Sequence, residues 1–284
     1  MGHLTDRGRV AMVTGASSGI GAAIVQALLR EGLTVVGVAR RIHRVKELEL
    51  KDASGQLHAI EGDVSSEESI ISVFKWIKEN LGGVDILINN AGVTAEAAPS
   101  SGKTEDWKRV LDVNVLGLSI CTREAVQDML SRGVDDGFII HINSVLGHVP
   151  AIDDVVVIYC ASKHAVRVLL EGLRLDLVAK KSRIRVGQIS PGAVMTEIWD
   201  YQTKFSKEVA MAMPHMQPED VAAAVVYMLS QHPRVQWFEE DDSCEEGNIF
   251  EDASSEESAN EPADVSIEAD DNPSNNITSS ESEN

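Results

Sequence analysis

Short apolar runs alternate with longer amphipathic stretches along residues 1–238. The apolar runs are rich in β-branched residues, as expected of strands in a sheet that has both faces covered by helices. The longer stretches repeat apolar residues at helical spacing, for example at Ile70, Phe74 and Ile77. This alternation predicts βαβ units, and therefore a single α/β domain built on a doubly wound, mostly parallel sheet.

The same pattern sets the expected bounds of the strands and helices. We expect strands at Arg9–Thr14, Thr34–Val38, His58–Glu61, Asp85–Asn89, Phe138–Asn143 and Arg185–Ser190. We expect helices at Ile20–Glu31, Glu67–Asn80, Trp107–Leu130, Tyr159–Lys180 and Gln217–Leu229. The first helix is expected to be capped by Gly32, because glycine adopts the left-handed conformation that closes many helices.

Residues after Phe238 have a different composition. Of the formal charge of −20, residues 239–284 carry −17, because they contain 17 Asp and Glu and no Lys or Arg. With few apolar residues to bury, this segment has little to offset the entropy lost on folding. We therefore expect a folded domain over residues 7–238 and a disordered acidic tail over residues 239–284. Ser254–Glu257 and Ser279–Glu281 resemble sites of acidophilic kinases, so a solvated extension, a regulatory segment and a docking segment for a basic partner all stay open.

Residues 1–238 are left with a charge of about −3 and are therefore nearly neutral, so nothing in them suggests the clustered Lys and Arg that a nucleic-acid-binding surface needs. No apolar run approaches the ~20 residues that span a bilayer, and the first residues have no signal-peptide pattern. The three cysteines are unclustered, and the histidines lack the company of further metal ligands. We expect a cytoplasmic protein with reduced thiols, no membrane span, no nucleic-acid partner and no metal.

Thr14–Gly21 places three glycines where the first strand is expected to give way to the first helix. Gly15 permits a tight turn, Gly19 lets the backbone approach a pyrophosphate, and Gly21 allows the helix to pack close to the strand. A pyrophosphate then binds at the helix N-terminus, where free N–H groups and the helix dipole favour an anion. Strand, loop and helix in this order predict a dinucleotide site, with a plain glycine-rich turn as the alternative.

The end of the second strand meets the adenosine ribose in this architecture. An acidic residue there would bind the ribose 2′-hydroxyl and repel a 2′-phosphate, but this chain has Ala39, Arg40 and Arg41. Arg40 is able to stack on adenine and to bind a phosphate, and Ser17 in the glycine loop is placed to donate to the same phosphate. These residues favour NADP(H) over NAD(H); the alternative is a pair of solvated arginines in front of a helix.

Tyr159 and Lys163 are four residues apart and share one face of the expected helix. A free tyrosine has a pKa of about 10, and a neighbouring cation lowers that pKa by favouring the phenolate. Tyr159 is therefore expected to exchange a proton with a substrate oxygen, while Lys163 supplies the cation and binds the nicotinamide ribose. Ser144, after the fifth strand, is expected to hold the same oxygen. Asn114, in an apolar part of a long helix, is expected to anchor a water behind Lys163.

In this order, these residues resemble the classical short-chain dehydrogenases/reductases, and the resemblance covers roughly residues 7–238. The resemblance implies a Rossmann fold with six or seven strands, in which Val235–Phe238 starts the seventh, and a homodimer or homotetramer. The matching positions are Thr14, Gly15, Gly19, Gly21, Asp63, Asn89, Asn90, Ala91, Gly92, Asn114, Ser144, Tyr159, Lys163, Pro191, Gly192 and Thr196.

The loop and the resemblance together give the expected site residues. By resemblance, Asp63 and Val64 contact adenine, Asn90 ties neighbouring strands together beside the cofactor, and Thr196 binds near the nicotinamide carboxamide. The expected catalytic residues are Asn114, Ser144, Tyr159 and Lys163. The expected cofactor-binding residues are Gly15, Ser17, Ser18, Gly19, Ile20, Gly21, Arg40, Arg41, Asp63, Val64, Asn90, Ala91, Gly92, Tyr159, Lys163, Pro191, Gly192, Val194 and Thr196.

Three further segments, Val35–Arg41, Ser119–Glu124 and Asp135–Gly137, resemble a narrower group within the family. It contains insect farnesol dehydrogenase-like proteins and a vertebrate member-eleven dehydrogenase/reductase, and it implies NADP(H) and apolar alcohols, ketones or steroids. Residues between Gly192 and Pro218 cover the substrate pocket of such a fold. Here they are apolar and rich in methionine, which suits a flexible apolar substrate; the alternative is that they only pack a helix onto the domain. They include Met195, Ile198, Trp199, Tyr201, Phe205, Met211 and Met213.

The sequence therefore predicts an NADP(H)-dependent oxidoreductase that transfers hydride between the nicotinamide and an apolar alcohol or carbonyl compound. A prenyl alcohol such as farnesol and a keto-steroid are the expected kinds of substrate, with Tyr159 as acid and base. The alternative is a cofactor-binding protein that acts mainly through interactions of residues 239–284. The aligned Asn, Ser, Tyr and Lys favour the enzyme, because a protein without catalysis has no need of them.

Overall fold

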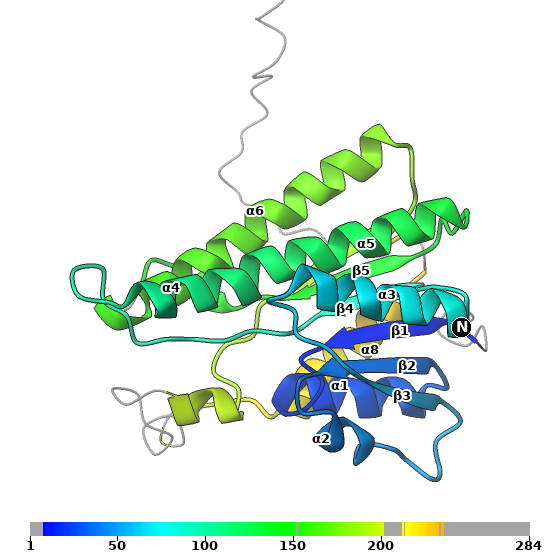
Figure 1. Cartoon of the computed structure of the whole chain (residues 1–284), viewed down its shortest axis with the longest axis horizontal. Coiled ribbons are helices and arrows are strands. Elements are labelled where there is room, and N and C mark those ends of the chain that lie inside the picture. Colours follow the sequence, from blue (N-terminus) through cyan, green and yellow to red (C-terminus); the bar gives the residue numbers. More distant parts are fainter. Residues whose placement is uncertain (1–7, 152, 202–211, 213, 233, 236–284) are drawn as a thin grey trace, which may run out of the picture. The chain divides into compact units, whose positions relative to one another are not determined.

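Six parallel strands form one sheet in the order β3-β2-β1-β4-β5-β6 (Figure 1). This computed structural model describes residues 8–151, 153–201, 212, 214–232 and 234–235. Chain order reverses between β1 and β4, as in doubly wound folds, so the predicted fold class is confirmed. The strands are β1 (Val10–Thr14), β2 (Thr34–Ala39), β3 (Gln56–Glu61), β4 (Ile86–Asn89), β5 (Phe138–Ile142) and β6 (Arg185–Ile189).

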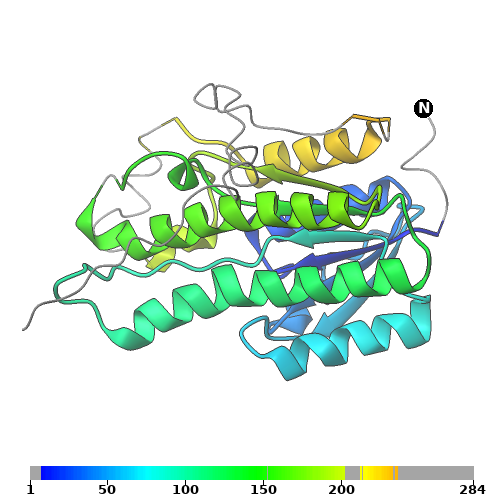
Figure 2. The same cartoon turned by 90° about the horizontal axis from the view of Figure 1, so that it is seen from above.

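Helices cover both faces of the sheet (Figure 1). On one face, α1 (Gly19–Arg30) and α8 (Pro218–Ser230) bury apolar residues such as Leu28 and Val225 against alternate residues of β1 and β4. On the other face, α3 (Glu67–Leu81), α5 (Leu118–Ser131) and α6 (Val157–Ala179) bury residues such as Ile77 and Met129. Figure 2 shows these three helices side by side across that face. The inner strands β1, β4 and β5 are largely apolar because both of their faces are buried, whereas the edge strand β3 is partly exposed and carries Gln56, His58 and Glu61.

The predicted helix Trp107–Leu130 is wrong in its start and in its continuity. The structure has α4 (Thr104–Leu111), a π-helical turn at Asp112–Gly117 and then α5. Gly117 explains part of this arrangement, since a Cβ there would lie 2.3 Å from the carbonyl oxygen of Val64. The close approach brings the turn against the loop that follows β3. Single π turns of this kind often occur at functional sites.

Other elements differ in smaller ways from the expected ones. The first helix ends at Arg30, its cap is Glu31, and Gly32 follows with a φ of +84°. The left-handed glycine thus lies one position beyond the cap, where it is most often found. A short helix, α2 (Ile42–Lys46), follows β2 and was not predicted. It matters for function because it places Arg44 beside the cleft described below.

Two expectations fall outside the described residues. They are a seventh strand over Val235–Phe238, of which only Val235 is described, and the boundary between residues 7–238 and the acidic tail at residues 239–284. Among the helices that the structure does describe, none has both the length and the apolar character to cross a bilayer.

Candidate active site

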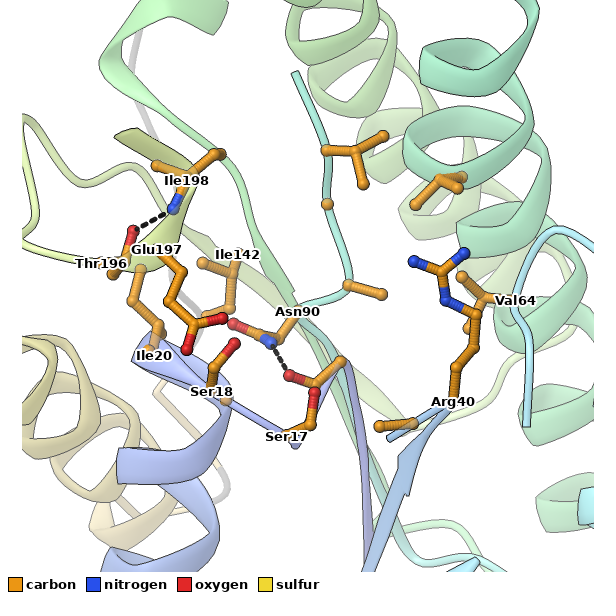
Figure 3. A pocket seen from close by; sticks show the side chains of 18 of the residues that line it. Ser17, Ser18, Ile20, Arg40, Val64, Asn90, Ile142, Thr196, Glu197 and Ile198 are labelled. Atoms are coloured by element: carbon orange, nitrogen blue, oxygen red, sulfur yellow. Dashed lines mark hydrogen bonds between the residues drawn. The ribbon is translucent and has the colours of Figure 1, made fainter. Parts of the chain in front are cut away.

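A cleft of about 350 Å³ opens at the carboxyl ends of the strands, where the chain order reverses between β1 and β4. Open α/β sheets bind their ligands at such a point. Figure 3 shows the cleft with side chains from the glycine loop, from the ends of β2 and β4 and from the segment after β6. Of the predicted cofactor-binding residues, it is lined by Gly15, Ser17, Ser18, Gly19, Ile20, Gly21, Arg40, Arg41, Asp63, Val64, Asn90, Ala91, Gly92, Tyr159, Lys163 and Thr196.

The remaining predicted cofactor-binding residues lie in the segment after β6. The Pro191 carbonyl accepts a hydrogen bond from the Val145 amide at 3.0 Å, which ties this segment to the loop that carries Ser144. Val194 is buried and pairs with Met216 in an isolated bridge. Gly192 has open space around it, because a Cβ there would meet no atom within 4 Å. The segment leads directly to Thr196 in the cleft.

The three glycine positions of the loop leave no room for a Cβ. Gly15 and Gly19 have φ values of +66° and +55°, in the left-handed region that favours glycine. A Cβ on Gly15 would lie 2.8 Å from the Cα of Ala91, and a Cβ on Gly21 would lie 2.4 Å from Nδ2 of Asn90. The loop therefore exposes bare backbone at the N-terminus of α1. This arrangement fits a dinucleotide phosphate, which needs a close approach to free N–H groups.

Asn90 fixes the position of this loop. Its Nδ2 donates to the Thr14 carbonyl at 2.8 Å, and the amides of Asn90 and Ala91 both donate to Thr14 Oγ1 at 3.0 Å. These bonds join the ends of β1 and β4. They agree with the expectation that Asn90 ties neighbouring strands together.

The arginines after β2 divide their contacts in a way that the sequence did not predict. Arg41 Nη2 donates to Ser18 Oγ at 3.0 Å and to Ser17 Oγ at 3.4 Å. Arg40 turns toward Val64 (Figure 3) and its charge acts on Asp63. Burial raises the pKa of Asp63, but hydrogen bonds from Ser65 and the Arg40 charge outweigh it and lower that pKa overall. Arg41 is therefore hydrogen-bonded to the glycine loop, and Arg40 faces Asp63 and Val64, the residues that are expected to contact adenine.

Tyr159 and Lys163 line the cleft, and Ser144 lies buried beside Tyr159. Ser144 follows β5, and its side chain is hydrogen-bonded to the Tyr159 hydroxyl. Lys163 lies one turn after Tyr159 on α6, with its Nζ 5.7 Å from the centre of the tyrosine ring. The same Nζ donates to the Ile142 carbonyl at 2.9 Å. The arrangement brings two hydroxyl groups and a cation together at one side of the cleft.

Asn114 braces the set from the π-helical turn. Its Oδ1 accepts from the Val93 amide at 2.9 Å, and its Nδ2 donates to the Val93 carbonyl at 2.9 Å and to Ser162 Oγ at 3.0 Å. Ser162 Oγ in turn donates to the Tyr159 carbonyl at 2.7 Å. The side chain of Asn114 thus joins the loop after β4 to the first turns of α6. The water that it was expected to anchor stays a prediction.

Burial controls the electrostatics of this pair. It raises the pKa of Tyr159 to about 12, against the hydrogen bond from Ser144, and it lowers the pKa of Lys163 to about 8. The expected lowering of the tyrosine pKa by Lys163 is therefore absent in the protein alone. The lysine nitrogen points at the Ile142 carbonyl, and loss of water penalises both charged forms. Tyr159 is consequently a neutral hydroxyl at neutral pH, ready to donate.

Several residues of the cleft have no signal in the sequence motifs. Glu197 comes from the 3₁₀ turn Glu197–Tyr201 after β6, and Arg109 comes from α4. Of the expected pocket cover, Ile198 lines the cleft, whereas Trp199 Nε1 donates to the Val194 carbonyl at 2.8 Å. Phe205, Met211 and Met213 lie outside the described residues. Over the described part of the chain, no three His, Cys, Asp or Glu side chains form a group that would hold a metal ion.

His141 lies in a buried polar cluster on β5. Its Nε2 is 3.4 Å from Thr122 Oγ1, which accepts a hydrogen bond from Asn89 Nδ2 at 2.9 Å. Burial is the main cause that lowers the pKa of His141 to about 3, and the charge of Lys163 acts in the same direction. His141 is therefore neutral in the folded protein at any pH well above 3.

We expect this histidine to make the protein less stable in mild acid. An unfolded histidine has a pKa of about 6.5, so below that pH His141 is protonated in the unfolded chain but stays neutral in the folded protein. The free energy of unfolding falls by about 1.4 kcal/mol at pH 5.5 for this reason, and further toward pH 3. Urea unfolding at pH 7.5 and 5.5 measures the loss, which should shrink in His141→Gln and persist in His43→Gln, an exposed control on α2. Equal losses in both variants would contradict the assignment.

Comparison with known proteins relates this site to a family. A family model described as short chain dehydrogenase matches residues 9–207. The chain is 47% identical over 238 residues to dehydrogenase/reductase SDR family member 11 of Mus musculus, which covers 81% of this chain and 92% of that protein. It is 46% identical over 235 residues to farnesol dehydrogenase of Aedes aegypti, covering 81% and 93%.

A solved structure gives the same answer at the level of the fold. The closed form of serine dehydrogenase complexed with NADP+ aligns with a TM-score of 0.71 and 27% identity, covering 84% of this chain and 97% of that chain. The family model spans more than half of the 284 residues, and the relatives share nearly half of their residues with the chain. This chain therefore belongs to the short-chain dehydrogenase family of oxidoreductases, as its motifs predict.

Proposed function

We propose that the chain is an NADP(H)-dependent oxidoreductase that interconverts apolar alcohols and their carbonyl compounds. The observation that carries the proposal is the meeting of Ser144, Tyr159 and Lys163 beside a cleft that also contains the glycine loop. When bound, the nicotinamide supplies or accepts a hydride at its C4 position. The chain's own residues then have to orient the substrate oxygen and move one proton.

Each residue has a role that follows from its contacts. In reduction, the neutral Tyr159 hydroxyl donates its proton to the substrate oxygen, and Ser144 donates a hydrogen bond to the same oxygen. The Lys163 ammonium group stabilises the phenolate that remains. In oxidation, the phenolate takes the proton back. Asn114 is a positioning residue, since it reaches the Tyr159 backbone through Ser162.

The preference for NADP(H) rests on the residues around the adenosine end of the cleft. β2 ends at Ala39 without an acidic residue, and Arg40 and Arg41 follow it into the cleft. Arg41, rather than Arg40, contacts Ser17, the residue that was expected to share a phosphate with Arg40. The serine dehydrogenase structure contains NADP+, which supports the same choice.

The substrate class rests on a relative and on apolar side chains near the reacting groups. Val145 and Val149 follow Ser144 and are more than 40% exposed, and Ile198 lines the cleft. Exposed apolar side chains beside a catalytic hydroxyl suit a substrate with a hydrocarbon body. The relative from Aedes aegypti is a farnesol dehydrogenase. We therefore propose prenyl alcohols such as farnesol, or keto-steroids, as substrates.

Absorbance at the nicotinamide band tests this function. Purified full-length protein is assayed with NADP(H) and NAD(H) separately, against prenyl alcohols, their aldehydes, keto-steroids and small diketones. We expect turnover with NADP(H), a several-fold lower kcat/KM with NAD(H), and the best rates with apolar substrates. Tight NADPH binding without turnover on any member would instead favour the cofactor-binding protein, and removal of residues 239–284 should then abolish binding of a partner. A tail-less enzyme with full activity counts against that alternative.

A further inference from the structure

Glu197 puts a carboxylate into the cleft from the segment after β6. It is the first residue of the 3₁₀ turn Glu197–Tyr201 and follows Thr196 directly. Figure 3 shows its side chain pointing into the cleft beside Ser18 of the glycine loop. A negative charge at this place is unexpected, because the same cleft is built from bare backbone N–H groups and arginines that suit phosphates.

Two arginines hold this carboxylate. Arg41 Nη1 lies 3.0 Å from Glu197 Oε2, and Arg44 Nη1 lies 2.5 Å from Oε1. Arg41 also donates from Nη2 to Ser18 Oγ and Ser17 Oγ. The carboxylate, the two guanidinium groups and the two hydroxyls thus form one cluster, which we call the Glu197 cluster. Its five members are Ser17, Ser18, Arg41, Arg44 and Glu197.

The Glu197 cluster resembles an anion-binding site in which the Glu197 carboxylate takes the place of the bound anion. Burial raises the pKa of Glu197, but the hydrogen bonds and charges of Arg44 and Arg41 outweigh it, so the group stays ionised at neutral pH. The guanidinium groups present to the carboxylate the same donors that bind a phosphate. A phosphate that reaches Arg41 and Arg44 has to displace Glu197 or repel it.

The contacts are weak enough for that displacement. The side chains of Arg41, Arg44 and Glu197 are 41%, 38% and 37% exposed, so water screens both ion pairs. Exposed pairs of this kind contribute little, whereas a phosphate carries more charge and more acceptor oxygens than a carboxylate. A bound phosphate therefore displaces the Glu197 carboxylate from the two arginines. Its net affinity is reduced, because the ion pairs of Glu197 with Arg41 and Arg44 are lost when the phosphate binds.

We propose that Glu197 is a built-in competitor for a phosphate group of the cofactor, and so a determinant of how tightly and how selectively the cleft binds phosphorylated nucleotides. The inference rests on the proposed cofactor. It assigns to Glu197 a function that neither the glycine loop nor the proton-transfer residues supply. The proposed cofactor offers two candidates for this phosphate, the 2′-phosphate and the pyrophosphate.

Calorimetric titration of full-length protein with fragments of the cofactor tests the proposal without any turnover. The probes are 2′-AMP, which carries only the 2′-phosphate, and 5′-ADP, which carries only the pyrophosphate. In Glu197→Gln we expect about threefold to tenfold tighter binding of at least one probe, since two exposed ion pairs no longer compete. A gain confined to 2′-AMP assigns the 2′-phosphate, and a gain confined to 5′-ADP assigns the pyrophosphate.

Two control variants separate competition from general charge effects. Glu219→Gln removes the same charge from a neighbouring groove that Glu197 also lines, outside the Glu197 cluster, and should change the affinity of either probe by less than about twofold. In an Arg44→Gln background, the gain from Glu197→Gln should shrink, because one of the two contested cations is gone.

Each remaining outcome overturns something definite. If Glu197→Gln binds 2′-AMP and 5′-ADP with unchanged affinity, Glu197 does not compete with a phosphate and the proposal is wrong. Weaker binding of either probe also contradicts competition, and would instead show that Glu197 orients the arginines for the phosphate. If the unchanged protein binds neither the probes nor NADPH, the proposed cofactor is wrong as well. Failure of the inference alone, with NADPH binding intact, leaves the proposed function standing.

Discussion

Tyr159→Phe is expected to lower kcat by about 10³-fold while NADPH binding changes by less than about threefold. The substitution removes the hydroxyl oxygen, the only atom of Tyr159 that donates and accepts the proton in the proposed mechanism. General acid–base catalysis typically raises the rate by about 10²- to 10⁴-fold. The ring remains in place beneath Lys163, whose Nζ lies 5.7 Å from the ring centre. The cofactor loses at most one contact, so its affinity depends on the rest of the cleft.

Two measurements separate this result from a loss of folding. Single-turnover absorbance gives the chemical step, and quenching of protein fluorescence by NADPH gives the dissociation constant. Tyr227→Phe is the matched control, because Tyr227 is 57% exposed on α8, and its kcat should stay unchanged. A Tyr159→Phe protein that keeps more than about a tenth of the unchanged kcat would show that another group moves the proton.

The partial burial of Tyr159 is the physical reason for the large effect expected at this position. Its pKa of about 12 keeps the proton on the oxygen in the protein alone, and in the proposed reduction the nearby cation meets the new phenolate in a half-buried site. A charge that develops close to a fixed cation is stabilised more strongly without water than with it. The site therefore gains from the same burial that opposes ionisation in the protein alone.

The fold was largely predictable because its signals are local. Most strands are apolar runs of four to six residues, and the six predicted strands overlap the six observed ones. The order of motifs was enough to predict which residues come together, since residues at the carboxyl ends of parallel strands meet at one edge of the sheet. Gly15, Asn90, Ser144 and Tyr159 are far apart in sequence and nevertheless gather there.

The parts that were missed depend on contacts that a sequence does not display. The π-helical turn arises where Asn114 bonds to Val93, 21 residues away, and nothing in the local apolar pattern of the helix indicates it. Glu197 and Arg44 are separated by 153 residues, and an isolated glutamate near a threonine reads as a surface charge. The spacing of Tyr159 and Lys163 predicted their closeness correctly. It carried no information on burial, which decides both pKa values.

Gly21→Ala is expected to weaken NADPH binding by about a hundredfold and to lower the free energy of unfolding by about 1–3 kcal/mol, as overpacking of a filled site does. The new Cβ would lie 2.4 Å from Asn90 Nδ2 and 2.5 Å from the Gly15 carbonyl oxygen. Asn90 would have to give up its bond to the Thr14 carbonyl, or the loop would have to move away from α1. Either change alters the backbone that has to approach the phosphates.

Helix propensity alone predicts that Gly21→Ala stabilises the protein, so the expected loss of stability distinguishes close packing from propensity. Alanine is favoured over glycine inside a helix by about 1 kcal/mol, so Gly172→Ala on α6, where a Cβ meets no atom within 4 Å, should stabilise the protein and leave NADPH binding unchanged. Urea unfolding and NADPH titration of both variants give the comparison. If Gly21→Ala behaves like Gly172→Ala, the close packing of Gly21 against Asn90 and Gly15 does not form the cofactor site, and the phosphates bind elsewhere in the cleft.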